Sequence, residues 1–191
     1  MLIKLRANET PKEYSFAAIK LGGARSQILA RHLAHNESLT ALHLVRRNIA
    51  DTEGQDLAKM LLTNKTLKKL ELEGNCLGNK TAKELGFALQ HNTTLRYLDL
   101  EANQLGGQEQ ADCAGITKLI EGVRENKTLL VLNIANNSLG KEQGEKWRDC
   151  LKDNHTLIDF EFGNNGFSID DTRKIQEYLI RNRKLYDDAR I

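Results

Sequence analysis

One short motif, Asn followed two residues later by Ser or Thr and then by Leu, recurs along the chain at a nearly constant spacing. Its clear copies begin at Asn36, Asn64, Asn92, Asn126 and Asn154, and a degenerate copy begins at Asn8. Successive clear copies lie 28 residues apart except for one longer interval. Such a period indicates one repeated supersecondary unit, whose neighbours stack to bury a common core.

A second pattern, Leu-x-x-Leu-x-Leu-x-x-Asn-x-Leu, occupies the same phase of each unit. It is filled by Leu67, Leu70, Leu72, Asn75 and Leu77 in one copy and by the equivalent residues in the next. This pattern resembles the leucine-rich repeats, in which each unit is one strand and one helix. The period of about 28 residues is similar to that of the ribonuclease-inhibitor-like subfamily. The resemblance implies an α/β fold: a right-handed superhelix with parallel strands on its concave face and helices on its convex face.

Apolar residues three and seven positions before each motif place leucine-like side chains on one face of a helix. The predicted helices span 25–35, 52–63, 80–91, 115–125, 141–153 and 170–181. The predicted strands centre on Ser15, His43, Glu71, Asp99, Asn133 and Glu161. Alternation should point the flanking apolar residues into the core and the central residue onto the open face. The unbroken phase predicts a single domain over 1–191, closed by the last helix.

Two sets of asparagines have expected structural roles. The Asn of each Asn-x-Ser/Thr motif is expected to end a helix in the left-handed conformation, which Asn tolerates. The second set is expected to be buried and to satisfy backbone groups between units. It consists of Asn75, Asn103, Asn137 and Asn165.

The composition excludes several classes of function. With 28 Lys and Arg against 26 Asp and Glu, the net charge of +2 does not indicate a nucleic-acid or membrane surface. The N-terminus lacks the apolar stretch of a signal peptide, and the three cysteines form no C-x-x-C pair. We therefore predict a cytoplasmic protein without a metal or other cofactor. Cys150 takes a helix position that should face the core.

No motif in the sequence predicts catalysis. The segment 74–81 superficially resembles a phosphate-binding loop, but the spacing between its glycines and Lys80 is wrong. His43 is the one histidine predicted on the open face, and a lone histidine there is more typical of a surface residue than of a base. The chain is predicted not to be an enzyme.

Stacking the strands predicts an acidic open face. Glu71 should lie beside Asp99, and Glu73 beside Glu101, because neighbouring strands are about 4.8 Å apart. Like charges placed opposite each other destabilise a sheet, so this face needs either good solvation or a basic partner. If it binds a partner, that partner is a protein with a basic segment, and Tyr97 is the expected aromatic anchor. The predicted partner-binding residues are Lys69, Glu71, Glu73, Tyr97, Asp99, Glu101, Asn133, Asp159 and Glu161.

Two departures from the period also predict features. One unit is longer, with 34 residues between Leu95 and Leu129, and the excess at 106–113 is either a tolerated surface insertion or a binding loop. The segment 1–8 matches only the end of a helix, which leaves the first strand without a capping unit. Either the chain is part of a longer protein, or another segment or subunit covers this edge, as in self-association.

The phrasing of two repeats, at 64–70 and 92–98, is similar to the C-terminal domain of tropomodulins, which caps actin filaments. It is also similar to nucleotide-sensing receptors, the Ran GTPase-activating protein and axonemal proteins. The resemblance leaves three functions open: a non-catalytic protein-interaction module, a cytoskeletal protein that caps actin or serves as an axonemal scaffold, and a regulator of a small GTPase. The cytoskeletal function implies association with the cytoskeleton or cilium. The regulator function implies a residue of this chain that completes a GTPase site. Because a fold does not define a function, we favour the interaction module.

Overall fold

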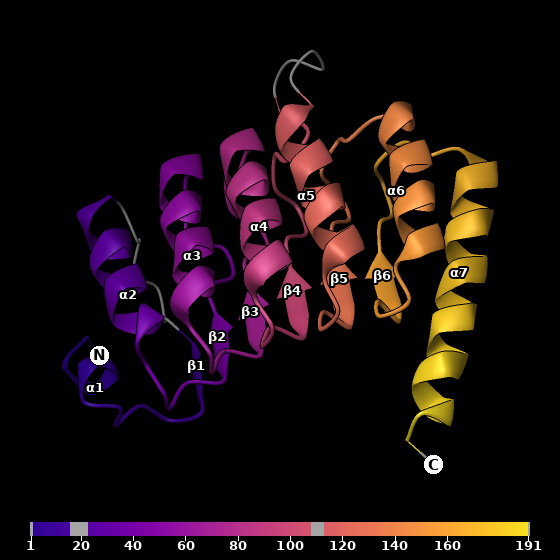
Figure 1. Cartoon of the computed structure of the whole chain (residues 1–191). Coiled ribbons are helices and arrows are strands. Elements are labelled where there is room, and N and C mark those ends of the chain that lie inside the picture. Colours follow the sequence, from indigo (N-terminus) through magenta and orange to yellow (C-terminus); the bar gives the residue numbers. More distant parts are fainter. Residues whose placement is uncertain (1, 16–22, 108–112, 191) are drawn as a thin grey trace.

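The computed structural model describes residues 2–15, 23–107 and 113–190, in which seven helices alternate with six strands (Figure 1). The strands are β1 (Glu13–Ser15), β2 (Ala41–His43), β3 (Lys69–Glu71), β4 (Tyr97–Asp99), β5 (Val131–Asn133) and β6 (Asp159–Glu161). The helices are α1 (Leu2–Arg6), α2 (Ala24–Ala34), α3 (Asp51–Thr63), α4 (Asn79–His91), α5 (Ala114–Glu125), α6 (Lys141–Asp153) and α7 (Ile169–Asp188). Each strand lies one residue earlier than expected, and five of the helices match their predicted ranges within one residue.

The strands form one parallel sheet in the order of the sequence. Its register places Leu42 opposite Leu70 and Leu70 opposite Leu98, so equivalent residues of successive units are neighbours. Helices α2 to α7 stand side by side along one face of this sheet, and the other face is open (Figure 1). The predicted α/β solenoid of parallel strands and covering helices is therefore confirmed.

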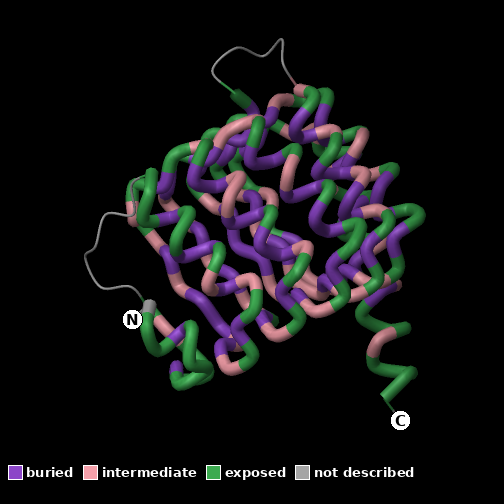
Figure 2. Tube along the Cα trace, turned by 60° about the vertical axis from the view of Figure 1, so that its left-hand side comes forward, coloured by how far each residue is buried: buried purple, intermediate pink, exposed green. Residues whose placement is uncertain are grey.

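The core lies between the sheet and the helices. The central leucine of each inner strand is fully buried, as are the helix leucines at the predicted spacing, such as Leu57 and Leu61. Figure 2 shows the buried positions on the inner side of every unit, with exposed positions on the outer side of the helices. Cys150 is buried in this core, as predicted.

The asparagines of the five clear Asn-x-Ser/Thr copies are not left-handed, so that prediction was wrong for them, whereas Asn8 of the degenerate copy has a positive φ of 56°. Asn92 follows α4 in an extended conformation with φ of −81°. Its Oδ1 accepts the backbone N–H groups of Thr94 and Leu95, at 2.9 and 2.7 Å. Its Nδ2 donates to the carbonyl oxygen of Leu61 in the preceding unit, at 2.7 Å. The motif therefore needs Asn because one buried amide joins two units, and not because Asn tolerates a positive φ.

The second set of asparagines is buried and joins units, as predicted. Asn103 donates from Nδ2 to the carbonyl oxygens of Leu72 and Leu100, each at 3.0 Å. Its Oδ1 accepts the N–H of Leu77 at 3.0 Å. The same side chain thus satisfies backbone groups of its own unit and of the preceding one.

The two ends of the solenoid differ from the interior. At the C-terminal end, α7 continues past the predicted boundary at residue 181, and no turn forms at Asn182. The buried Asn182 side chain instead donates from within the helix to the carbonyl oxygens of Asn154 and Leu157, at 3.0 and 2.8 Å.

At the N-terminal end, α1 packs against α2 and its Leu5 is buried. The Leu5 carbonyl oxygen accepts a hydrogen bond from Asn36 Nδ2 at 2.8 Å, as the Leu33 carbonyl oxygen does from Asn64 at 2.6 Å. Within the described residues β1 is an edge strand. Self-association through this edge stays a prediction. Phe16 and most of the predicted insertion, 108–112, lie outside the described residues.

Candidate interaction surface on the concave face

The parallel register gathers the predicted partner-binding residues on the open face of the sheet. Lys69 lies opposite Tyr97, and Glu71 lies opposite Asp99. Asn133 lies opposite Glu161 in the same row as Asp99, and Asp159 continues the row of Tyr97. The two remaining residues, Glu73 and Glu101, follow β3 and β4. All nine residues therefore belong to one continuous surface, which we call the concave face.

Two of the carboxylates on this face are neutralised within the chain. Glu71 forms an ion pair with Lys69 at 2.7 Å and a hydrogen bond with His43 Nδ1 at 2.5 Å. Burial acts to raise the pKa of Glu71, but the hydrogen bonds with His43 and Lys69 outweigh it and hold the pKa below its usual value. Glu73 pairs with Arg46 at 3.0 Å. The predicted acidity is thus weaker over β3 than the count of carboxylates indicated.

His43 was predicted on the open face but not as a partner of Glu71, and Arg46 was missed as a member of this surface. Both could have been found from the period, because His43 precedes Glu71 by 28 residues and Arg46 precedes Glu73 by 27. Residues one period apart are neighbours on adjacent strands. The prediction compared carboxylates only with one another and left out the basic residues of the preceding unit.

Asp99 lies at the centre of the surface and is only 7% exposed. Its Oδ1 accepts the backbone N–H of Glu101 at 2.9 Å. Burial, together with the charges of Glu73, Glu101 and Glu71, raises the pKa of the Asp99 carboxyl. Burial and the charge of Asp99 likewise raise the pKa of Tyr97 to about 12, and Lys69 Nζ lies 4.6 Å from the centre of the Tyr97 ring.

Three carboxylates of the concave face, those of Asp99, Glu101 and Glu161, form no ion pair with any described residue. Glu101 accepts hydrogen bonds from the amide nitrogens of Asn133 and Asn136, at 2.9 and 3.0 Å. The carboxylate of the exposed Glu161 has no hydrogen bond or ion pair with any described residue. Asp159 differs, because Arg183 of α7 lies 3.4 Å away. The net negative part of the concave face therefore centres on Asp99, Glu101 and Glu161.

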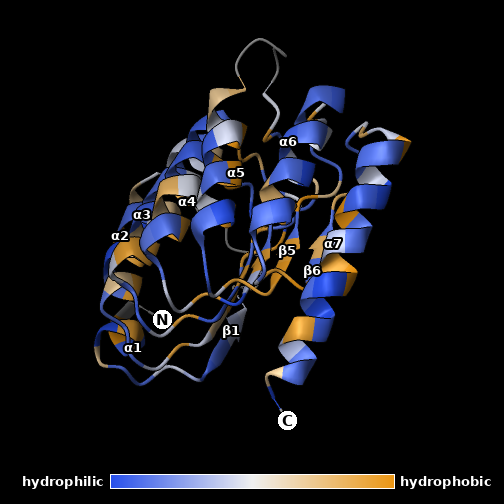
Figure 3. Cartoon of the chain, turned by 45° about the vertical axis from the view of Figure 1, so that its right-hand side comes forward, coloured by the Kyte–Doolittle hydropathy of each residue, from blue (hydrophilic) through white to orange (hydrophobic). Residues whose placement is uncertain are grey.

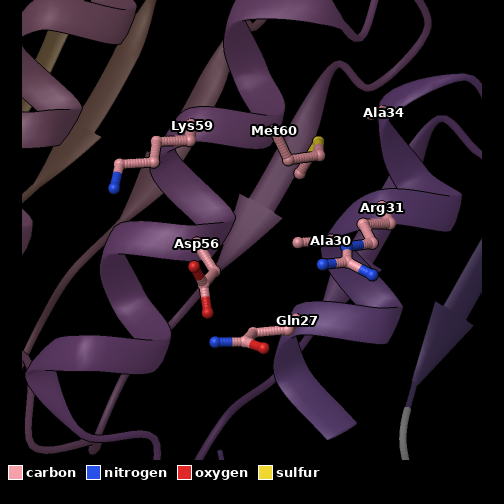
Figure 4. Close-up of a pocket in the computed structure, with 7 residues that line it drawn as sticks. All are labelled: Gln27, Ala30, Arg31, Ala34, Asp56, Lys59 and Met60. Carbon is pink, nitrogen blue, oxygen red and sulfur yellow. The ribbon is translucent and has the colours of Figure 1, made fainter. Parts of the chain in front are cut away.

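Other parts of the described chain offer little for chemistry. No three His, Cys, Asp or Glu side chains in residues 2–15, 23–107 and 113–190 converge to hold a metal ion. No helix among those residues is both long and apolar enough to cross a membrane. A crevice between α2 and α3 has a volume of about 340 Å³ and is lined by Gln27, Arg31, Asp56 and Lys59 among others (Figure 4).

In the loop that resembles a phosphate-binding motif, backbone N–H groups already donate hydrogen bonds to a carboxylate of this chain. Asp51 Oδ1 accepts the backbone N–H groups of Gly78 and Thr81, at 2.9 and 2.7 Å. The Thr81 hydroxyl is also committed, because it donates to the Asp51 carbonyl oxygen at 2.9 Å. The start of α4 thus receives a carboxylate from the preceding unit.

The fold and the open face define a class of protein: an α/β solenoid with a solvent-facing parallel sheet. The family model described as "Leucine Rich repeat" matches residues 63–86 and 91–108. The match covers less than half of the chain, and together with the α/β solenoid it supports a leucine-rich repeat protein. Its ribonuclease-inhibitor-like subtype stays a prediction.

Two solved structures share the fold. One is titled "Leiomodin-1 Actin-Binding Site 2 (ABS2)"; it is 17% identical, with a TM-score of 0.65, and the match covers 99% of this chain and 91% of that one. The other is the tropomodulin C-terminal domain of Caenorhabditis elegans, which is 16% identical with a TM-score of 0.66, covering 99% of this chain and 95% of that one. A search of the curated proteins found no match. At these identities the likeness concerns the fold.

Proposed function

We propose that this chain is a non-catalytic protein-interaction module whose concave face binds a partner through a basic segment. The observation that carries the proposal is a set of three carboxylates over β4 to β6, Asp99, Glu101 and Glu161, that have no close cation among the described residues. Neighbouring carboxylates repel one another, and a cationic segment laid across them would relieve that repulsion. Solenoids commonly use the concave surface for binding.

The contacts on this face indicate how the segment would lie. Glu101 and Glu161 are accessible, so they would pair directly with Lys or Arg side chains. Asp99 is nearly buried, so it would attract the basic segment electrostatically without direct contact. One face of the Tyr97 ring is close to Lys69, which leaves the other part of this half-buried ring for contact with the partner. Lys69 and Asn133 would border the segment.

Charge reversal at accessible positions tests this proposal. The double variant Glu101→Lys/Glu161→Lys is compared with Glu125→Lys, which reverses an exposed charge at the end of α5. Each tagged protein is used for affinity capture from cell extract over a range of salt concentrations. A protein that is captured by wild type and by Glu125→Lys, but not by the double variant, is the expected result. Equal capture by all three proteins at every salt concentration would exclude the concave face.

A second candidate function is binding to the actin cytoskeleton, with a corresponding location in the cell. It is favoured by the fold shared with a domain whose title names it an actin-binding site of leiomodin-1. Co-sedimentation with filamentous actin and a pointed-end elongation assay test this candidate. If wild type pellets with actin and the double variant Glu101→Lys/Glu161→Lys does not, actin is the partner that the concave face binds. A chain that stays in the supernatant and does not slow elongation is not an actin-binding module.

A further inference from the structure

The last strand of the sheet has an edge that the next unit would cover in the interior. In interior units the residue after each strand donates its backbone N–H to the following strand. Leu100 donates to the Asn133 carbonyl oxygen and Ile134 to the Glu161 carbonyl oxygen, each at 2.8 Å. Phe162 is the equivalent residue of the last unit, and no strand follows β6 in the described part of the chain. Its N–H therefore faces the open end.

Helix α7 closes only the beginning of this edge. In the preceding unit the Leu130 carbonyl oxygen accepts the N–H groups of Ile158 and Asp159, at 2.9 and 3.1 Å. Ile158 is the equivalent of Leu130, and its carbonyl oxygen accepts Arg183 Nε at 2.7 Å. The arginine thus replaces the N–H of a following strand at one point. No described residue provides such a replacement at the edge beyond it, towards Phe162.

A groove lined by both apolar and polar side chains lies along the uncovered part. It has a volume of about 510 Å³ and is lined by Phe160, Phe162, Leu179 and Ile180, with Glu161 and Arg183 among its polar residues. The Phe162 ring lies 5.1 Å from the ring of Phe160 and 5.7 Å from that of Phe167, which gives the groove a firm aromatic wall. Ile180 on α7 is 65% exposed. Figure 3 shows hydrophobic positions on both β6 and α7, which stand side by side at this end. We call this the edge groove.

We propose that the edge groove binds an extended segment of a protein partner, which adds a strand to β6. An open strand edge beside a partly apolar groove supports this mode of recognition, in which backbone hydrogen bonds give affinity and alternate side chains give specificity. The apolar side chains of the segment would fill the groove between Phe162 and Ile180. Its basic side chains would pair with Glu161, the exposed carboxylate at the rim without a cation.

A second copy of this chain fits the edge groove poorly. Because Asn36 contacts Leu5 as Asn64 contacts Leu33, α1 already occupies the place of a preceding helix end at the N-terminal side of the stack. The C-terminal half of α7 from a docked copy would need that same place. The proposed occupant is therefore a single extended segment.

A fluorescein-labelled decapeptide of alternating valine and lysine is the probe, and anisotropy measures its binding. Ile180→Arg places a bulky cation in the groove, and Ile169→Arg is the matched control because Ile169 is 88% exposed on the same helix and does not line the groove. We expect Ile180→Arg to weaken binding at least tenfold and Ile169→Arg to change it less than twofold. Glu101→Lys should weaken binding much less than Ile180→Arg does, because Glu101 lies on the concave face and does not line the groove, whereas Glu161 belongs to both.

Methylation of the backbone nitrogens in the centre of the peptide tests strand addition itself. The methylated peptide keeps its side chains but loses the donors that an added strand needs, so its binding should fall at least tenfold. Thermal unfolding of each variant confirms that the fold is retained. No binding of the probe, equal binding of the methylated peptide, or a loss caused by Glu101→Lys but not by Ile180→Arg would overturn the proposal. The last result would still support the concave face.

Discussion

Replacing Asn92 with alanine is expected to destabilise the folded chain by about 3 to 4 kcal/mol. The Asn92 side chain makes three short hydrogen bonds, to the Leu61 carbonyl oxygen and to the N–H groups of Thr94 and Leu95, at 2.7, 2.9 and 2.7 Å. Each contributes about 1 kcal/mol net, and a buried group left without a partner costs about 1–3 kcal/mol. Leu61 and Leu95 are fully buried, so water reaches their freed backbone groups poorly.

Urea unfolding measures this loss. With a slope of about 2 kcal/mol per molar urea, the midpoint should fall by roughly 1.5 to 2 M while the slope stays unchanged. Thr93→Ala is the matched control, because Thr93 is the exposed neighbour of Asn92 and its substitution should stay within about 0.5 kcal/mol. If Asn92→Ala shifts the midpoint no more than Thr93→Ala does, the asparagine ladder does not join the units energetically.

Three further predictions follow from packing and burial. Gly86→Ala should destabilise the chain by about 2 kcal/mol, because an added Cβ would lie 2.1 Å from the Lys118 carbonyl oxygen and force α4 away from α5. Cys150 should resist iodoacetamide in the folded protein at roughly pH 8, since burial raises the pKa of its thiol to about 12; peptide mass spectrometry reads the modification. Asp99→Asn should raise the melting temperature at neutral pH. Burial and neighbouring carboxylates raise the pKa of Asp99 in the folded protein above its usual value of 3.8. Wild type therefore loses stability as the pH rises from 3.8 through this raised pKa.

Each of these predictions has its own control. An added Cβ at Gly163 meets no atom within 4 Å, so Gly163→Ala should be nearly neutral, and equal stability of the two alanine variants would contradict the close approach of α4 and α5. Cys76 is exposed and should be modified readily; similar rates at Cys150 would show that the core opens. For Asp99→Asn, the gain should vanish at low pH, where the wild-type carboxyl is protonated. A gain that persists there has another cause than charge.

The period of the sequence was enough to predict the units and most of their boundaries. A spacing of 28 residues with leucines in constant phase allows one strand and one helix per unit, and equivalent residues must then become neighbours. The pairing of Glu71 with Asp99 followed from this arithmetic. The second asparagine set also followed, because a buried amide at a fixed phase has backbone groups of the adjacent unit within reach.

The sequence was less informative where a side chain has several possible partners. The helix-ending asparagines were assigned a left-handed backbone, although the observed hydrogen bonds to the preceding unit require an extended one. The acidity of Glu71 and Glu73 was overestimated, because the rotamers of His43, Lys69 and Arg46 decide which carboxylates they reach. The extension of α7 past Asn182 was missed because the same residue can serve a turn or a helix.

The sequence by itself determined the repeating unit, the direction of the strands and the identity of the core, since these depend on spacing and hydrophobicity alone. Only the tertiary structure decided which charges on the concave face remain uncompensated and which part of the last strand stays open. Those properties arise from contacts between units, and a contact depends on distances of a few ångströms that no residue spacing specifies.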